Sequence, residues 1–238
     1  MGAVGGVAGD EFALSTSRGP SIRAARDQFR DQGRKRSSRR SPSENRPDGP
    51  CSTGGFAEDV IAVLDALSID SADVYGTSMG GRTAQWLAIT HPDRVRRLVL
   101  AAPRRVARTP SKATPRSAAP SRRPTGKQPE RALLELMCSP EWLASHDGPR
   151  TVVGDRDMSA HARRHHLAAS NGHNAWEQLD ERFAQHGADD RMTPASNAEL
   201  LAQRILEAEA HVLPGLRHAY FHENRPVASK LVGDFLAD

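Results

Sequence analysis

The sequence contains few aromatic residues and few cysteines. Of its 238 residues, 5% are aromatic and 37% are hydrophobic. Such a polar composition indicates that long stretches bury little, so we expect a smaller core than the length allows. Cys51 and Cys138 are the only cysteines. Two cysteines exclude a disulfide framework and favour a reducing compartment, which predicts a cytoplasmic protein.

Long apolar runs are also absent. No stretch approaches the roughly 18 apolar residues of a membrane helix. The first residues, MGAVGGVAGDEF, show neither a basic start nor a long apolar segment, so no signal peptide is predicted. We therefore expect no membrane partner.

Positive charge is concentrated in two segments. Residues 18–50 hold ten Lys/Arg against four Asp/Glu, and residues 103–131 hold nine against one. Frequent Pro and Ser accompany this charge, which predicts disorder over residues 1–52 and 103–130. These segments offer almost no aromatic side chains for stacking on bases, so nucleic acid is not an expected partner.

Two explanations of the basic segments remain open. They could be genuine disordered tails that bind acidic partners, which would make the chain a basic-tailed binding protein. Alternatively, they could be out-of-frame translation of a GC-rich gene, which tends to yield Arg, Pro, Ser, Ala and Gly. The other two reading frames of the gene decide between them, because a frameshift requires that one of those frames restores apolar strands.

The rest of the chain alternates between helical and strand patterns. This succession predicts an α/β fold with a parallel sheet and crossover helices. The predicted elements are a helix at 56–67 capped by Thr53, a strand at 72–76, a helix at 77–92, a strand at 95–102, helical text at 131–183, a helix at 195–208, a strand at 210–215 and a helix at 227–236.

The pentapeptide GTSMG, residues 76–80, lies where a predicted strand passes into a helix. This strand–turn–helix context is what a nucleophile elbow requires, and it identifies Ser78 as the attacking residue. The flanking residues Gly76 and Gly80 allow a turn too tight for Cβ atoms. The backbone N–H of Met79 can then face a developing oxyanion. The non-catalytic alternatives are a plain glycine-rich turn or a phosphate loop, but the Lys of a phosphate loop is absent.

A serine nucleophile needs a base, and the base needs an orienting carboxylate. Asp190 lies in the segment HGADDRMTP, and His218 follows the predicted strand at 210–215. The order Ser, acid, His is that of the α/β-hydrolases. The alternatives are a helix-capping aspartate and an exposed loop histidine.

On these motifs, residues 53–102 and 184–236 resemble the serine α/β-hydrolases of the esterase, lactonase and haloperoxidase-like kind. Within that resemblance, the G-x-x-D-x-x-x-P pattern assigns the acid to Asp190 rather than Asp189. The P-G-x-x-H pattern assigns the base to His218 rather than His222. The resemblance implies a catalytic triad of Ser78, Asp190 and His218 that cleaves an ester-like bond of a small molecule. It implies no cofactor and no metal.

The resemblance also defines what the sequence lacks. The N-terminal strands, the His-Gly loop that carries the second oxyanion donor, and the apolar strand before the acid are not recognisable. We therefore predict a partial α/β-hydrolase sheet, with core segments at 53–102 and 184–238 and a helical cap at 131–183. A degenerate, inactive remnant of the family is the alternative to an active enzyme.

The predicted cap contains candidates of a different kind. Trp142, His173 and Trp176 could line a pocket or pack the cap. A histidine cluster at 161–166 is predicted to be a solvated helix face, since no Cys, Asp or Glu completes a metal site around it.

Overall fold

The computed structural model describes residues 12–15, 51–103, 129–146, 160–175, 183–204 and 208–237. The predicted disordered segments at 1–52 and 103–130 therefore lie mostly outside the described residues. The elements in chain order are β1 (Phe12–Ser15), α2 (Thr53–Ala66), β2 (Ala72–Thr77), α3 (Met79–Thr90), a 3-10 turn η1 (Pro92–Arg94), β3 (Val95–Ala101), α4 (Pro129–Met137), α5 (Pro140–Ser145), α7 (Ala160–Asn171), β4 (Phe183–Gly187), α8 (Ser196–Arg204), β5 (Glu209–Leu213), α9 (Tyr220–Glu223) and α10 (Arg225–Ala237).

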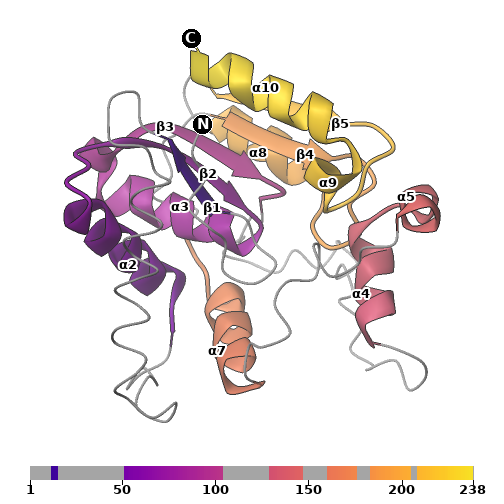
Figure 1. The fold of residues 1–238 in the computed structure, drawn as a ribbon, viewed down its shortest axis with the longest axis horizontal. Helices are drawn as coiled ribbons and strands as arrows, with labels where there is room; N and C mark the ends of the chain where they lie inside the picture. The colour runs from indigo at the N-terminus through magenta and orange to yellow at the C-terminus, as the bar shows by residue number, and fades with distance from the viewer. Residues whose placement is uncertain are drawn as a thin grey trace.

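A five-stranded sheet in the order β1-β2-β3-β4-β5 organises the fold (Figure 1). Strands β2, β3, β4 and β5 run parallel to one another, and β1 pairs with β2 in the antiparallel direction. Parallel strands require a crossover on each return, and α3 and α8 provide two of these crossovers. The carboxyl ends of β2 to β5 consequently meet at one edge of the sheet.

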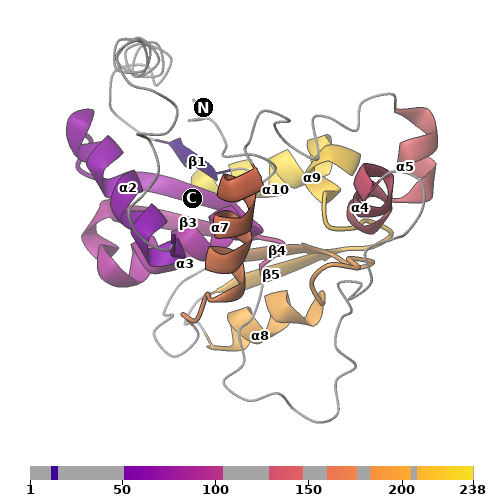
Figure 2. The ribbon, with the colours of Figure 1, turned by 90° about the horizontal axis from the view of Figure 1, so that it is seen from below.

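Two apolar layers cover the sheet. On one face, leucines of α2, α3, β3 and α8 pack together, with Leu64, Leu87 and Leu98 fully buried. On the other face, α4, α9 and α10 pack around Tyr220 and Phe221. Figure 2 shows α8 and α10 on opposite sides of the sheet. The sheet is therefore covered on both faces, as a parallel sheet requires.

Two strands are present that the sequence did not predict. The segment Phe183–Gly187 forms β4, which pairs with β3 and β5, so the prediction that no strand precedes the acid is wrong. Its sequence, FAQHG, has no β-branched residue, and the polar residues Gln185 and His186 are buried in it. Strand β1 lies within the segment predicted to be disordered and pairs with β2.

The cap of α2 also differs from the prediction. The Ser52 hydroxyl, rather than that of Thr53, accepts a hydrogen bond from the N–H of Gly55 at 2.9 Å. Thr53 is buried instead and contacts His173. Within the described residues, no helix has the length and apolar character needed to cross a bilayer.

Candidate active site

Ser78 occupies a strained turn between β2 and α3. Its backbone has φ 51° and ψ −111°, which is rare for a residue with a side chain. The N–H of Ser78 donates to the carbonyl of Ala101 at the end of β3, at 2.9 Å. A Cβ built on Gly76 would overlap the backbone of Gly80 and Gly81. The turn therefore requires glycine at position 76, and its geometry is that of the predicted elbow.

Met79 is the first residue of α3. Backbone N–H groups in the first turn of a helix have no acceptor within the helix, and the helix dipole favours negative charge there. The position of Met79 is thus suited to an oxyanion beside Ser78.

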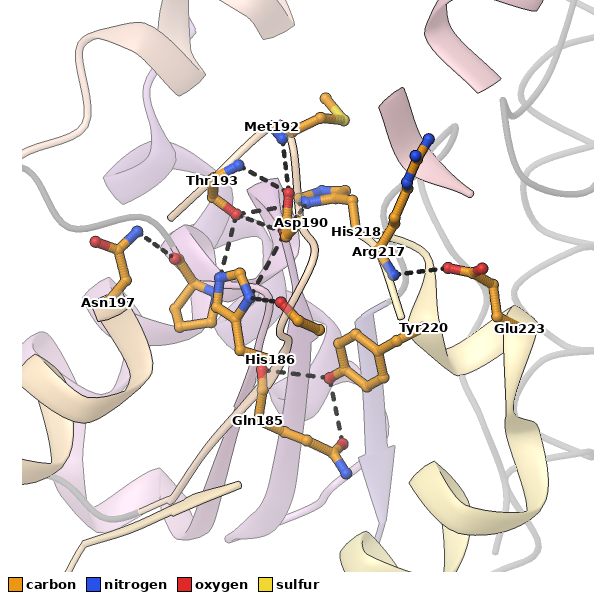
Figure 3. A network of polar contacts seen from close by, with 12 residues as sticks. Gln185, His186, Asp190, Met192, Thr193, Asn197, Arg217, His218, Tyr220 and Glu223 are labelled. Atoms are coloured by element: carbon orange, nitrogen blue, oxygen red, sulfur yellow. Dashed lines mark hydrogen bonds and ion pairs between the residues drawn. The ribbon is translucent and has the colours of Figure 1, made fainter. Parts of the chain in front are cut away.

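The side chain of Asp190 is fully buried and accepts four hydrogen bonds (Figure 3). Its Oδ1 accepts from the N–H of Met192 at 2.7 Å and of Thr193 at 2.9 Å. Its Oδ2 accepts from the Thr193 hydroxyl at 2.8 Å and contacts Nδ1 of His218 at 2.7 Å. These contacts fill the acceptor positions of a carboxylate. Asp190 therefore does not cap α8, which begins at Ser196; its Oδ1 holds the loop backbone, and its Oδ2 holds His218.

The electrostatics of this pair favour an ionised Asp190. Burial acts to raise the pKa of Asp190, but the hydrogen bond and charge of His218, with help from His186 and the Thr193 backbone, hold that pKa below its ordinary value. His218 is itself 2% exposed. A buried carboxylate bonded to Nδ1 orients the imidazole so that Nε2 is directed away from the acid.

Backbone hydrogen bonds bring the loops of the three residues to one edge of the sheet. The Ala102 N–H donates to Gln185 of β4 at 2.9 Å, and the Ala188 N–H donates to Leu213 of β5 at 2.8 Å. A Cβ on Gly187 would overlap the carbonyls of Leu216 and Arg217, so the acid loop and the histidine loop are in close backbone contact.

The histidine loop is also tied to the helices at 129–145. The carboxylate of Glu223 accepts from the N–H of Arg217 at 2.8 Å and from the N–H of Ser139 at 2.7 Å. The Ala219 N–H donates to the carbonyl of Met137 at 2.8 Å. These bonds flank His218 on both sides and restrict the backbone that carries it.

The structure thus joins two of the three predicted triad members directly. Asp190 and His218 form a hydrogen bond, whereas within the described residues no hydrogen bond joins the Ser78 hydroxyl to His218. Contacts between nucleophile and base are often long before substrate binds. The alternative acid Asp189 is exposed, and the alternative base His222 lies in α9.

The candidate residues of the predicted cap make other contacts. His173 is buried between the Thr53 hydroxyl and the Gln85 amide, each at 3.0 Å, and Trp142 stacks on His146. Trp176 lies outside the described residues. The rings of His161 and His165 lie 4.2 Å apart, and the described part of the chain contains no group of three potential metal ligands.

Sequence reasoning missed two residues beside the acid. His186 is fully buried, with Nδ1 3.6 Å from Oδ2 of Asp190, and Thr193 lies between them. Both belong to the segment that identified the acid. A polar side chain in the middle of a short strand was the available signal, but its burial is visible only once β4 is known.

Comparisons with known proteins agree with this fold. A sequence profile of the alpha/beta hydrolase fold family matches residues 32–133. The 2-hydroxymuconate semialdehyde hydrolase of Pseudomonas putida is 33% identical over 217 residues, which covers 82% of this chain and 73% of that protein. The 3-oxoadipate enol-lactonase 2 of Acinetobacter baylyi is 47% identical over 55 residues, which covers 23% of this chain and 21% of that protein.

A solved hydrolase structure from Pseudomonas aeruginosa PA01 has a TM-score of 0.64 and 26% identity, covering 81% of this chain and 74% of that chain. Fold, profile and relatives agree on a class of hydrolases that act on small molecules. The chain belongs to the alpha/beta hydrolase fold family.

Proposed function

We propose that this protein is a serine hydrolase that cleaves an ester-like bond, in a carboxylic ester or a lactone, through an acyl-enzyme. One observation supports this proposal above others. The fully buried carboxylate of Asp190 bonds His218 at 2.7 Å, on the sheet edge where the strained backbone of Ser78 emerges.

The proposed reaction has two steps. His218 takes the proton of the Ser78 hydroxyl as its oxygen attacks the carbonyl carbon, and the Met79 N–H stabilises the oxyanion. His218 then gives that proton to the leaving oxygen, and the acyl group remains on Ser78. Water, deprotonated by His218, attacks the acyl carbon. The bond from that carbon to the Ser78 oxygen then breaks, and His218 returns the proton to that oxygen as the carboxylic acid leaves.

The residues assigned here supply one oxyanion donor. The family resemblance implies a second donor from a His-Gly loop that the sequence does not show. Removing one such donor typically reduces kcat by about 10² to 10³. A slow enzyme therefore fits the proposal, and a degenerate remnant without activity is its main competitor.

A second candidate function is cleavage of a carbon–carbon bond beside a carbonyl group. The observation that favours it is the similarity to 2-hydroxymuconate semialdehyde hydrolases from two Pseudomonas sources, at 33% and 30% identity over 82% of this chain. Both candidate reactions use the same serine, base and acid. They differ in the leaving group, which is an oxygen in one and a carbon in the other.

Rapid mixing with a p-nitrophenyl ester tests the proposal. We expect a burst of p-nitrophenol equal to the enzyme concentration, followed by slower turnover, because p-nitrophenol is a good leaving group and acylation is then faster than hydrolysis of the acyl-enzyme. Ser78→Ala should abolish the burst. Ser68→Ala is the matched control, because Ser68 is an exposed serine that also has a positive φ, of 53°.

A parallel assay with 2-hydroxymuconate semialdehyde distinguishes the two reactions. Ser78-dependent turnover of this compound with no ester burst would replace the ester assignment with the carbon–carbon one. No Ser78-dependent reaction with either compound, in a protein that unfolds cooperatively, would establish the remnant.

A further inference from the structure

Beside the acid, two polar residues form a second branch of contacts that the proposed mechanism does not use. His186 is fully buried in β4, and Thr193 is buried in the loop before α8. Figure 3 shows both side chains directed toward the carboxylate of Asp190. The carboxylate therefore lies between two histidines.

The hydroxyl of Thr193 connects these groups. Its Oγ1 is 2.8 Å from Oδ2 of Asp190, 3.3 Å from Nε2 of His186 and 3.5 Å from Nδ1 of His218. Nδ1 of His218 lies nearer to Asp190, at 2.7 Å. A hydroxyl has a single proton, and the shorter distance and the negative charge both direct that proton to Asp190. Nδ1 of His186 lies 3.1 Å from the carbonyl of Gly187, so a neutral ring carries its proton on Nδ1 and presents a lone pair, not a donor, to Thr193. Thr193 is therefore the side chain that donates a hydroxyl proton to the acid.

We propose that Thr193 is a positioning residue that sets the basicity of His218 through Asp190. The inference rests on the proposed function, in which Asp190 orients His218. The hydrogen bond that Thr193 donates to Oδ2 draws electron density from the oxygen that holds His218. Thr193 therefore moderates the pull of Asp190 on the proton of His218 and fixes the direction of that oxygen.

The surroundings of His186 keep its ring neutral and fix its tautomer. Nδ1 lies 3.1 Å from the carbonyl of Gly187, and the carbonyl of Pro103 also faces the ring. Burial lowers the pKa of His186, although Asp190 and these carbonyls oppose the change. The neutral ring donates from Nδ1, and its Nε2, at 3.3 Å, competes only weakly for the proton that Thr193 gives to Asp190 at 2.8 Å.

Thr193→Val removes the hydroxyl at nearly constant volume. Without that donor, Oδ2 attracts the His218 proton more strongly. The acid limb of the pH profile, which is the fall of kcat/KM as His218 becomes protonated, should therefore move to higher pH by about half a unit to one unit. The value of kcat/KM at the optimum should fall about tenfold, as for one lost hydrogen bond to a charged group. Thr193→Ser keeps the hydroxyl and should restore the wild-type limb. Thr90→Val, which removes an exposed hydroxyl bonded to the Trp86 carbonyl, is the control and should leave the limb unchanged.

Titration of ¹⁵N-histidine-labelled protein by NMR, in a Ser78→Ala background, separates this inference from the proposed function. The titration of His218 should move upward in Thr193→Val whether or not the enzyme turns over a substrate. An unmoved His218 titration in a folded Thr193→Val protein, or a shift that Thr193→Ser does not reverse, would overturn the inference.

Discussion

Replacing Asp190 by asparagine tests the electrostatic core of the site. The carboxylate accepts hydrogen bonds at 2.7 to 2.9 Å from two backbone N–H groups, the Thr193 hydroxyl and Nδ1 of His218. An asparagine has one oxygen and one NH₂ group. If its oxygen keeps the two N–H contacts, its NH₂ faces the Thr193 hydroxyl and the His218 ring.

The expected loss follows from those contacts. His218 must present an acceptor to the amide, so the ring adopts the wrong tautomer for a base, and a change of this kind costs about 10⁴ in kcat. Exchanging a charged acceptor for a donor at a fully buried position also destabilises the fold, by about 2–4 kcal/mol. We expect both effects in Asp190→Asn and neither in Asp189→Asn, because Asp189 is exposed.

The assay is steady-state ester hydrolysis below the melting temperature of both variants, with urea unfolding to measure stability. An Asp190→Asn protein that is folded and retains more than a tenth of wild-type kcat would refute the assignment of the acid. Equal losses in Asp189→Asn would refute the choice between the two aspartates.

Three further results are expected. Because the pKa of Asp190 is depressed in the folded protein, its contribution to stability is complete above the ordinary carboxyl pKa and is lost as pH falls through the folded value; urea unfolding between about pH 6 and 3 should show a smaller acid-induced loss in Asp190→Asn than in wild type. Gly76→Ala should destabilise the protein by about 1–3 kcal/mol, since the new Cβ overlaps the backbone of Gly80 and Gly81, and an unchanged urea midpoint would contradict the tight elbow. Burial raises the pKa of the Cys138 thiol to about 12. In a Cys51→Ser variant, where Cys138 is the one remaining cysteine, a thiol reagent at pH 8 should therefore react only as fast as the protein unfolds. Rapid modification would contradict the burial of Cys138.

The parts of this site that could be predicted are those with a turn motif. The elbow at 76–80, the acid loop and the histidine loop each require particular residues at fixed spacing, and the sequence displays them. Their placement at one sheet edge followed from the parallel topology, since the carboxyl ends of parallel strands meet there.

The parts that could not be predicted depend on burial by distant segments. Strand β4 is short, and two of its residues are the polar Gln185 and His186, so its text has neither an apolar run nor a clear alternation. Tertiary pairing with β3 and β5 makes it a strand. The branch through Thr193 and His186 depends on that strand, which is why the sequence did not reveal it.

Active-site labelling provides the most direct test of the central claim. Wild-type protein treated with a fluorophosphonate should gain one adduct in its intact mass, and peptide mapping should place that adduct on Ser78. The Ser78→Ala and Asp190→Asn variants should remain unlabelled over the same period. A folded wild-type protein that takes no label, or takes it at another residue, would contradict the account of Ser78 as an activated nucleophile.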